Sequence, residues 1–360
     1  MGKEEDVEII LGVVGLLLLL VILTAYYGVM TENFKNLRVN VYLTVISIAR
    51  TAQFLPTYAV IMWLSVVLPG FFLPGQIPIA IAEGYSFFCF FSTIVNYLGG
   101  PTKVIDIIQN KMNNGRQLLF PCCCPTDARS FYERTLRALY HFIVTRTGFV
   151  CILLIFQLIM KYSDLSKKQH AALFGMAIMF QCISLGFLVN GFGSLVTFFE
   201  ILRDELANLL GIPKIALLKF CVGLIVIQGL IEQFLFASNT VTVKASDNYS
   251  AEDRAQMIYC FLVVAEYFVL SYAYYWAYSK DILPPGVPLL QNDETEGQDG
   301  DKVKEQQVPE SQSSAGEAQV DITFSEFIAQ VLDPRDVWKN LNPSSDGLTT
   351  PLTRADANAA

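Results

Sequence analysis

Seven long apolar stretches constrain the fold of this chain more than any other feature of its sequence. A helix needs roughly 20 mostly apolar residues to cross the hydrocarbon core of a bilayer, where it pairs its backbone polar groups internally. The stretches that meet this requirement are residues 9–29, 41–68, 76–98, 136–160, 171–199, 214–236 and 255–278. We therefore expect an all-α, polytopic membrane protein in which residues 1–280 form a seven-transmembrane-helix bundle. Pro56 interrupts the over-long second stretch and predicts a kink there.

Composition supports a membrane protein and assigns the charge of the chain to its tail. Hydrophobic residues make up 53% of the 360 residues and charged residues 16%, which is too apolar for a soluble domain. From Lys280 onward there are 15 acidic and six basic residues, so the net charge of −8 arises in this part. Acidic residues precede the first stretch and no cleavage pattern follows it, which indicates a first span and not a signal peptide.

The C-terminal residues 281–360 differ from the rest of the chain. They are acidic, rich in Gln, Ser and Gly, and poor in aromatic residues, which predicts a mostly disordered cytosolic tail. One apolar pattern interrupts this composition, at Phe324, Phe327, Ile328 and Val331. It predicts a short docking helix within residues 323–341.

The distribution of basic residues predicts the orientation. Loops one, three and five hold eight Lys and Arg residues, whereas the opposite side holds six. The N-terminus is thus expected outside or in the lumen and the C-terminus in the cytosol, in either the plasma membrane or an endomembrane. The acceptor sequence Asn248-Tyr249-Ser250 agrees, because this topology places Asn248 outside as a candidate glycosylation site.

The long third loop, residues 99–135, contains two features. Val104, Ile108 and Met112 belong to an apolar face that predicts either an interfacial helix on the bilayer or a short helix on the cytosolic face of the protein itself. Cys122, Cys123 and Cys124 then follow one another beside the membrane. Three consecutive thiols have poor geometry for zinc, so we predict S-palmitoylation; inert or redox-labile thiols are the alternative.

No enzyme signature is present in the sequence. The chain has two histidines, no Gly-rich phosphate loop followed by Lys-Ser/Thr, and no His/Cys spacing suited to zinc. We therefore expect a protein that is not an enzyme and that uses no cofactor and no metal.

Ionisable residues inside the spans are the main candidates for function, because a charge at mid-bilayer is costly and is normally turned toward a wet cavity or a partner. Helical spacing groups them with polar or aromatic neighbours, as i, i+3, as i, i+4 or over three turns. The candidates for a solute path are Arg50, Gln53, Glu83, Arg146, Gln157, Lys219, Gln228, Glu232, Glu266, Tyr267 and Tyr274. One interpretation is a polar, aromatic-lined path for an amphipathic or anionic organic solute, with Arg50 and Arg146 as its positive contacts. The other is pairing between helices, such as Arg with Glu, that fixes the bundle without touching a solute.

Several separated motifs resemble those of one family of seven-span proteins. Residues 50–65 read R-x(3)-F-x-P-x-Y-A-x(3)-W-L-S, and E-x-Y-x(2)-F and Y-L-G-G follow within residues 83–100. The cysteine run and the last two apolar stretches are similar as well. Together these motifs resemble the organic solute transporter alpha and transmembrane protein 184 family, and residues 333–337, Asp-Pro-Arg-Asp-Val, resemble a tail motif of the second branch.

This resemblance implies a seven-span protein that transports organic solutes such as sterol conjugates. The expected function is facilitative transport of amphipathic, sterol-conjugate-like or lipid-like solutes without ATP hydrolysis. The alternative is a seven-span receptor or trafficking scaffold whose tail recruits cytosolic partners. The partners expected are membrane lipids or sterols, a single-span beta-type subunit as the resemblance implies for the alpha branch, and further copies of the chain, with no nucleic acid.

Overall fold

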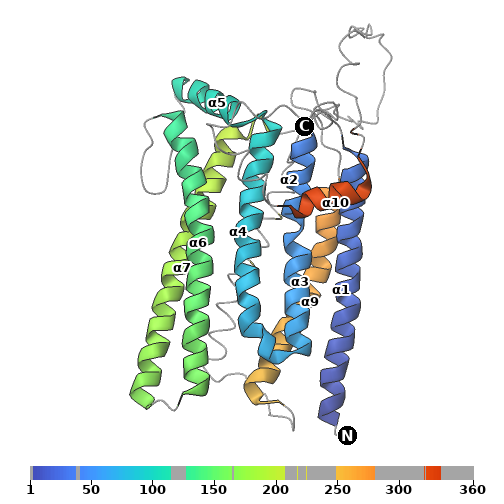
Figure 1. Cartoon of the computed structure of the whole chain (residues 1–360), viewed down its shortest axis with the longest axis vertical. Coiled ribbons are helices and arrows are strands. Elements are labelled where there is room, and N and C mark those ends of the chain that lie inside the picture. The colour runs from blue at the N-terminus through green and yellow to red at the C-terminus, as the bar shows by residue number, and fades with distance from the viewer. Residues whose placement is uncertain are drawn as a thin grey trace, which may run out of the picture.

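A computed structural model describes residues 3–37, 41–114, 127–163, 166–206, 249–279, 320 and 322–333, together with Leu217 and Leu224. Throughout these residues the regular elements are helices, and no strand occurs among them. Most of the helices lie side by side as long rods in a single bundle (Figure 1). The prediction of an all-α, polytopic membrane protein is confirmed.

Six membrane-length helical segments build the bundle. They are α1 (Lys3–Lys35), α2 (Tyr42–Ala52) continued by α3 (Phe54–Val67), α4 (Phe72–Tyr97), α6 (Ala128–Tyr162), α7 (Lys167–Leu202) and α9 (Ala251–Tyr278). A short 3-10 turn, η2 (Pro69–Phe71), connects α3 to α4. Each of the six is long and apolar enough to cross a membrane. The predicted span 214–236 lies outside the described residues except for Leu217 and Leu224.

The second segment is broken at Gln53, between α2 and α3. Pro56 has no backbone N–H, so it cannot donate to the carbonyl four residues earlier, which belongs to Ala52, the last residue of α2. The backbone N–H of Gln53 instead donates to the Arg50 carbonyl at 3.2 Å. Pro56 therefore leaves the Ala52 carbonyl without its usual helical donor, while the backbone of Gln53 stays in the α-helical region.

Two contacts show that the first and last spans run in the same direction. Near the start of both helices, Arg254 Nε of α9 lies 3.3 Å from Glu8 Oε1 of α1. Near the end of both, Asn33 Nδ2 of α1 donates to the Tyr278 carbonyl of α9 at 3.2 Å. The start of α1 and the end of α9 therefore lie at opposite ends of the bundle (Figure 1).

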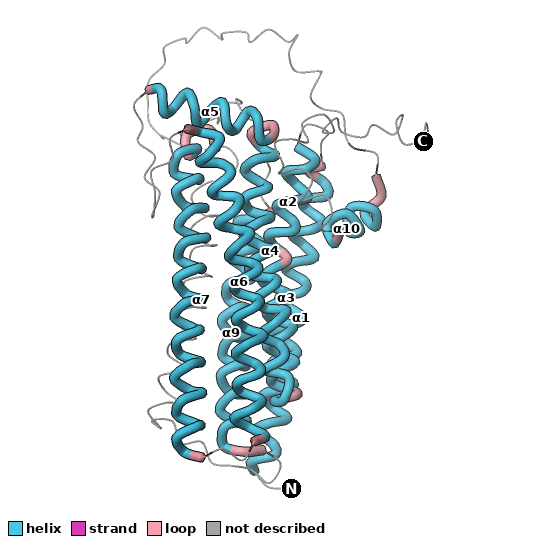
Figure 2. Tube along the Cα trace, turned by 60° about the vertical axis from the view of Figure 1, so that its left-hand side comes forward, coloured by secondary structure: helices cyan, strands magenta, loops and turns pink. Residues whose placement is uncertain are grey.

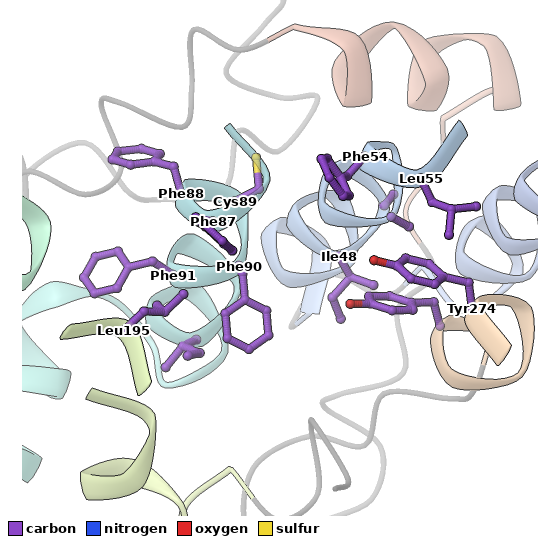
Figure 3. Packing of buried hydrophobic residues seen from close by; sticks show 14 of the residues in the cluster. Ile48, Phe54, Leu55, Phe87, Phe88, Cys89, Phe90, Phe91, Leu195 and Tyr274 are labelled. Atoms are coloured by element: carbon purple, nitrogen blue, oxygen red, sulfur yellow. The ribbon is translucent and has the colours of Figure 1, made fainter. Parts of the chain in front are cut away.

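An aromatic cluster forms the core between α4, α6 and α7. Phe91 packs against Phe198 with ring centroids 4.7 Å apart, and Phe87 packs against Phe142 at 5.4 Å. Figure 3 shows Phe87, Phe88, Phe90 and Phe91 spreading around α4 toward different neighbours. Tilted pairs of this kind add a little to the free energy gained by burying the rings. By contrast, much of the outer surface of α6 and α7 is apolar and exposed, as expected for helices that face lipid.

Helix α5 (Pro101–Asn113) lies across one end of the bundle (Figures 1 and 2). Val104 and Ile108 on its apolar face are fully buried, and the helix contacts α4, α6 and α7. Lys111 Nζ donates to the Ile201 carbonyl at 2.7 Å and pairs with Glu205 Oε2 at 2.6 Å, at the end of α7. The apolar face thus packs on the protein itself. Of the two alternatives given for the third loop, this is the short helix on the protein and not the interfacial helix on the bilayer.

A short helix from the tail, α10 (Phe324–Leu332), lies against the side of the bundle near the same end as α5 (Figure 2). The Thr323 side chain accepts from the Glu326 N–H, and the Glu326 carboxylate accepts from the Thr323 N–H, so the two residues form a capping box. Phe327 and Val331 on one face are fully buried. This helix occupies the first part of the range 323–341 predicted for a docking helix; residues 334–341 lie outside the described residues.

Candidate functional site

An ion pair between a buried carboxylate and a partly exposed arginine joins α4 to α6, and a hydrogen bond from the same arginine reaches α7. Glu83 of α4 is 2% exposed, and its Oε2 lies 3.4 Å from Arg146 Nε of α6. Arg146 Nη1 also donates to Ser184 Oγ of α7 at 3.2 Å. Because each charge would be costly alone in an apolar environment, the pair stabilises the packing of α4, α6 and α7.

Arg50 occupies a different environment, at the tail helix. Its side chain is buried, at 4% exposed, and within the described residues its hydrogen bonds go to backbone carbonyls at the C-terminal end of α10. Nε donates to Val331 at 3.2 Å, and Nη2 donates to Gln330 at 2.6 Å and to Asp333. The cation therefore caps a helix that follows it by 280 residues in the chain.

The two arginines do not meet. Arg50 lies on α2 and Arg146 on α6, and α4 packs against both of these helices. Helix α4 thus separates the two cations. The structure does not bring Arg50 and Arg146 together as two contacts of one solute.

The aromatic stripe of α9 packs against the broken span. Tyr267 is fully buried, and its ring lies 5.0 Å from the ring of Tyr58 in α3. Two turns further along, Tyr274 stacks on Tyr278 with ring centroids 4.9 Å apart. Figure 3 shows Tyr274 beside Leu55 and Ile48 of the broken span.

A small pocket lies at the break itself, between α1, α2–α3 and α9. It is partly open to the surroundings, and the free space inside it is about 10 Å³, which is room for roughly one water molecule. Its walls are mostly apolar, with four hydroxyl-bearing side chains among them: the lining residues are Ile22, Ala25, Tyr26, Val29, Ala52, Leu55, Pro56, Ser271, Tyr274 and Tyr275. A ring or a length of chain would therefore enter only by moving the lining side chains apart.

The remaining predicted residues are scattered or lie outside the described part of the chain. Gln53 forms the break, Gln157 is exposed on α6, and Glu266 is half-buried on α9. The residues outside the described part are Lys219, Gln228, Glu232, Cys122, Cys123, Cys124 and Asn248. Among the residues that the structure describes, no group of three or more His, Cys, Asp or Glu side chains is arranged to hold a metal ion.

Sequence reasoning missed several polar groups that complete these contacts. Ser184 is the third member of the ion-pair cluster, and Asn96 donates to Ser47 and Ser92, each at 3.1 Å, to join α2 and α4. Single Ser and Asn residues within apolar stretches give no periodic signal. The capping box of α10 was visible as Thr-x-x-Glu before an apolar pattern, but nothing in the sequence pointed from it to Arg50.

Comparison with known proteins gives one match. A family model described as Organic solute transporter Ostalpha matches residues 11–283, which covers α1 from Leu11 onward and the other five membrane-length segments, and excludes α10. A search among curated proteins and a search among solved structures each found no match.

Proposed function

The chain belongs to the organic solute transporter alpha family, and on that premise we propose that it carries amphipathic organic solutes across a membrane, down their gradient and without ATP hydrolysis. Membership makes it an integral membrane protein of a solute-transporting family. The class of solute, the energetics and the residues of the path are the proposal.

The position of the pocket is the observation that carries this proposal. Ala52, Leu55 and Pro56 line it, so it lies where the second span is interrupted. Transporters commonly bind solutes at discontinuous helices, where an unwound turn offers backbone polar groups inside the membrane. Here the interruption is a single residue, Gln53, whose backbone stays in the α-helical region, and the pocket beside it has a mostly apolar wall.

The chemistry of the lining favours an amphipathic solute. Apolar side chains of α1 and α3 would cover a fused-ring or acyl body, and the hydroxyls of Tyr26, Ser271 and Tyr274 would meet its polar substituents. A polar group that leaves water without a hydrogen-bond partner costs about 1 to 3 kcal/mol, so these hydroxyls lower the barrier to entry. Of the predicted path residues, Tyr274 lines this pocket, and Tyr267 packs against Tyr58 two turns before Tyr274 on α9.

The topology belongs to the proposal as well. Because the first and last spans are parallel, the chain from α1 to α9 has to cross the membrane an odd number of times. Six spans are described, and we propose residues 214–236 as the seventh, with the N-terminus outside or lumenal and the tail cytosolic. A single-span beta-type subunit remains a proposed partner that the family suggests.

Uptake into vesicles tests this function. Purified protein in vesicles is expected to take up labelled cholesterol sulfate above the level of empty vesicles, without ATP. Ala25→Phe should lower uptake, because it places a ring in the pocket. Val189→Phe is the matched control, since Val189 is 62% exposed on the lipid-facing side of α7 and should leave uptake unchanged. Uptake equal to empty vesicles, with and without a beta-type subunit, would contradict the proposal.

A further inference from the structure

The environment of Arg50 has the form of an anion-binding site. Three backbone carbonyl oxygens, those of Gln330, Val331 and Asp333, converge on one guanidinium group. The last carbonyls of a helix carry its partial negative charge and mostly lack partners within the helix, although that of Gln330 also accepts from the Asp333 N–H at 3.2 Å. They stand where the oxygens of a carboxylate or sulfate would stand, because the planar fork of arginine binds such groups through parallel N–H donors.

An apolar surface adjoins this cation. Phe34 of α1 packs edge-on against Phe324 at 5.2 Å and against Phe327 at 5.6 Å, while Phe327 and Val331 are completely buried. The C-terminal end of α10 thus places the partial negative charge of its carbonyls at Arg50, and the apolar face of the helix packs on α1 and α2. An amphipathic organic anion likewise has a negatively charged group beside an apolar body.

Three properties of the tail helix suit reversible docking at this site. It is nine residues long, and an isolated helix of that length is marginal in water, so its structure depends on this docking. It lies outside the residues 11–283 that define the family match. Its attachment to the same chain gives it a high effective concentration at the site without new contacts.

We propose that Arg50 is the anion contact of a binding site for amphipathic organic anions, and that α10 occupies this site as an intramolecular competitor. The anion replaces the three carbonyls at the guanidinium, and its apolar body replaces Phe327 and Val331. The solute class rests on the proposed function, whereas the competition rests only on the contacts of α10.

Binding of tritiated cholesterol sulfate to the purified full-length chain in lipid nanodiscs tests the proposal. Phe327→Asp should release α10 and strengthen binding about tenfold if α10 holds the site for nine-tenths of the time. Ala329→Asp adds the same charge on the exposed face of α10 and should leave binding unchanged. Adding Arg50→Gln to Phe327→Asp should remove the gain, and uncharged cholesterol should show no gain in any variant.

A second readout needs no change at Arg50. The Tyr42 hydroxyl donates to Gln330 Oε1, so a Tyr42→Cys, Gln330→Cys pair can be joined by a short cross-linker when α10 is docked, and the linked peptides are detected by mass spectrometry. Cholesterol sulfate should lower the yield in a dose-dependent manner, and cholesterol should not. Two results would overturn the proposal: equal cholesterol sulfate affinity in all variants, or a cross-linking yield that does not change when cholesterol sulfate is added. Loss of vesicle uptake with intact competition would count against transport alone.

Discussion

Glu83 and Arg146 form an ion pair at 3.4 Å between α4 and α6, with the carboxylate almost completely buried. Removing one partner leaves the other charge in an apolar environment. We expect Glu83→Leu alone to lower the free energy of unfolding by about 3 kcal/mol. The double variant Glu83→Leu, Arg146→Leu should recover much of this loss, because neither charge remains buried. Thermal unfolding in detergent measures the stability of the single and the double variant. A double variant that is less stable than Glu83→Leu would show that the pair does not act as a unit.

The glycine beside this carboxylate allows α4 and α6 to approach closely. A Cβ at Gly84 would lie 2.6 Å from Ile143 Cγ1 and 3.2 Å from Ile143 Cα, so a side chain there forces the helices apart. Gly84→Val should cost about 1 to 3 kcal/mol of unfolding free energy. Gly148→Val on α6 is the control, since a Cβ there meets nothing within 4 Å. A milder effect at Gly84 than at Gly148 would contradict this packing.

Lys111 attaches α5 to the end of α7. Its ammonium group donates to the Ile201 carbonyl and pairs with Glu205, and the side chain is largely covered. Lys111→Met should weaken the docking of α5 by about 1 to 2 kcal/mol, because it removes a charge-assisted contact to a helix C-terminus. Hydrogen exchange over residues 101–113 should become faster. Lys103→Met, on an exposed position of the same helix, should leave exchange unchanged.

The cysteine run lies outside the described residues, and its modification remains a prediction from sequence. Replacing Cys122, Cys123 and Cys124 by Ser should abolish incorporation of a palmitate analogue into the protein in cells. Replacing the buried Cys89 by Ser is the control and should leave incorporation unchanged, because that thiol cannot reach an acyl donor. Full labelling of the triple variant would refute the site.

The membrane fold could be predicted from sequence because lipid leaves a chain few choices. Long apolar stretches must become helices, and Pro56, which lacks an N–H donor, predicts the interruption of its span. Proline alone does not decide this, because Pro78 lies inside the continuous helix α4. The direction of the α5 face could not be predicted. A helix with Val104 and Ile108 on one side has the same periodicity whether it packs on lipid or on its own bundle, and only the positions of α6 and α7 decide between these two cases.

The partners of the buried charges were predictable only in part. A carboxylate and a guanidinium inside neighbouring spans suggest a pair, which Glu83 and Arg146 form. Arg50 has backbone carbonyls as its partners, and these belong to a helix far away in the chain. Every residue has a carbonyl, so no pattern of side chains could identify those of Gln330 and Val331.

Photochemical labelling tests the central claim most directly, namely that solutes bind where the second span is broken. Cholesterol sulfate carrying a photoreactive group would be irradiated with the purified protein in nanodiscs, and the labelled peptides identified by mass spectrometry. We predict labelling of Tyr26, Leu55 or Tyr274 that unlabelled cholesterol sulfate suppresses. Labelling confined to the lipid-facing residues of α6 and α7, and insensitive to competitor, would contradict the account.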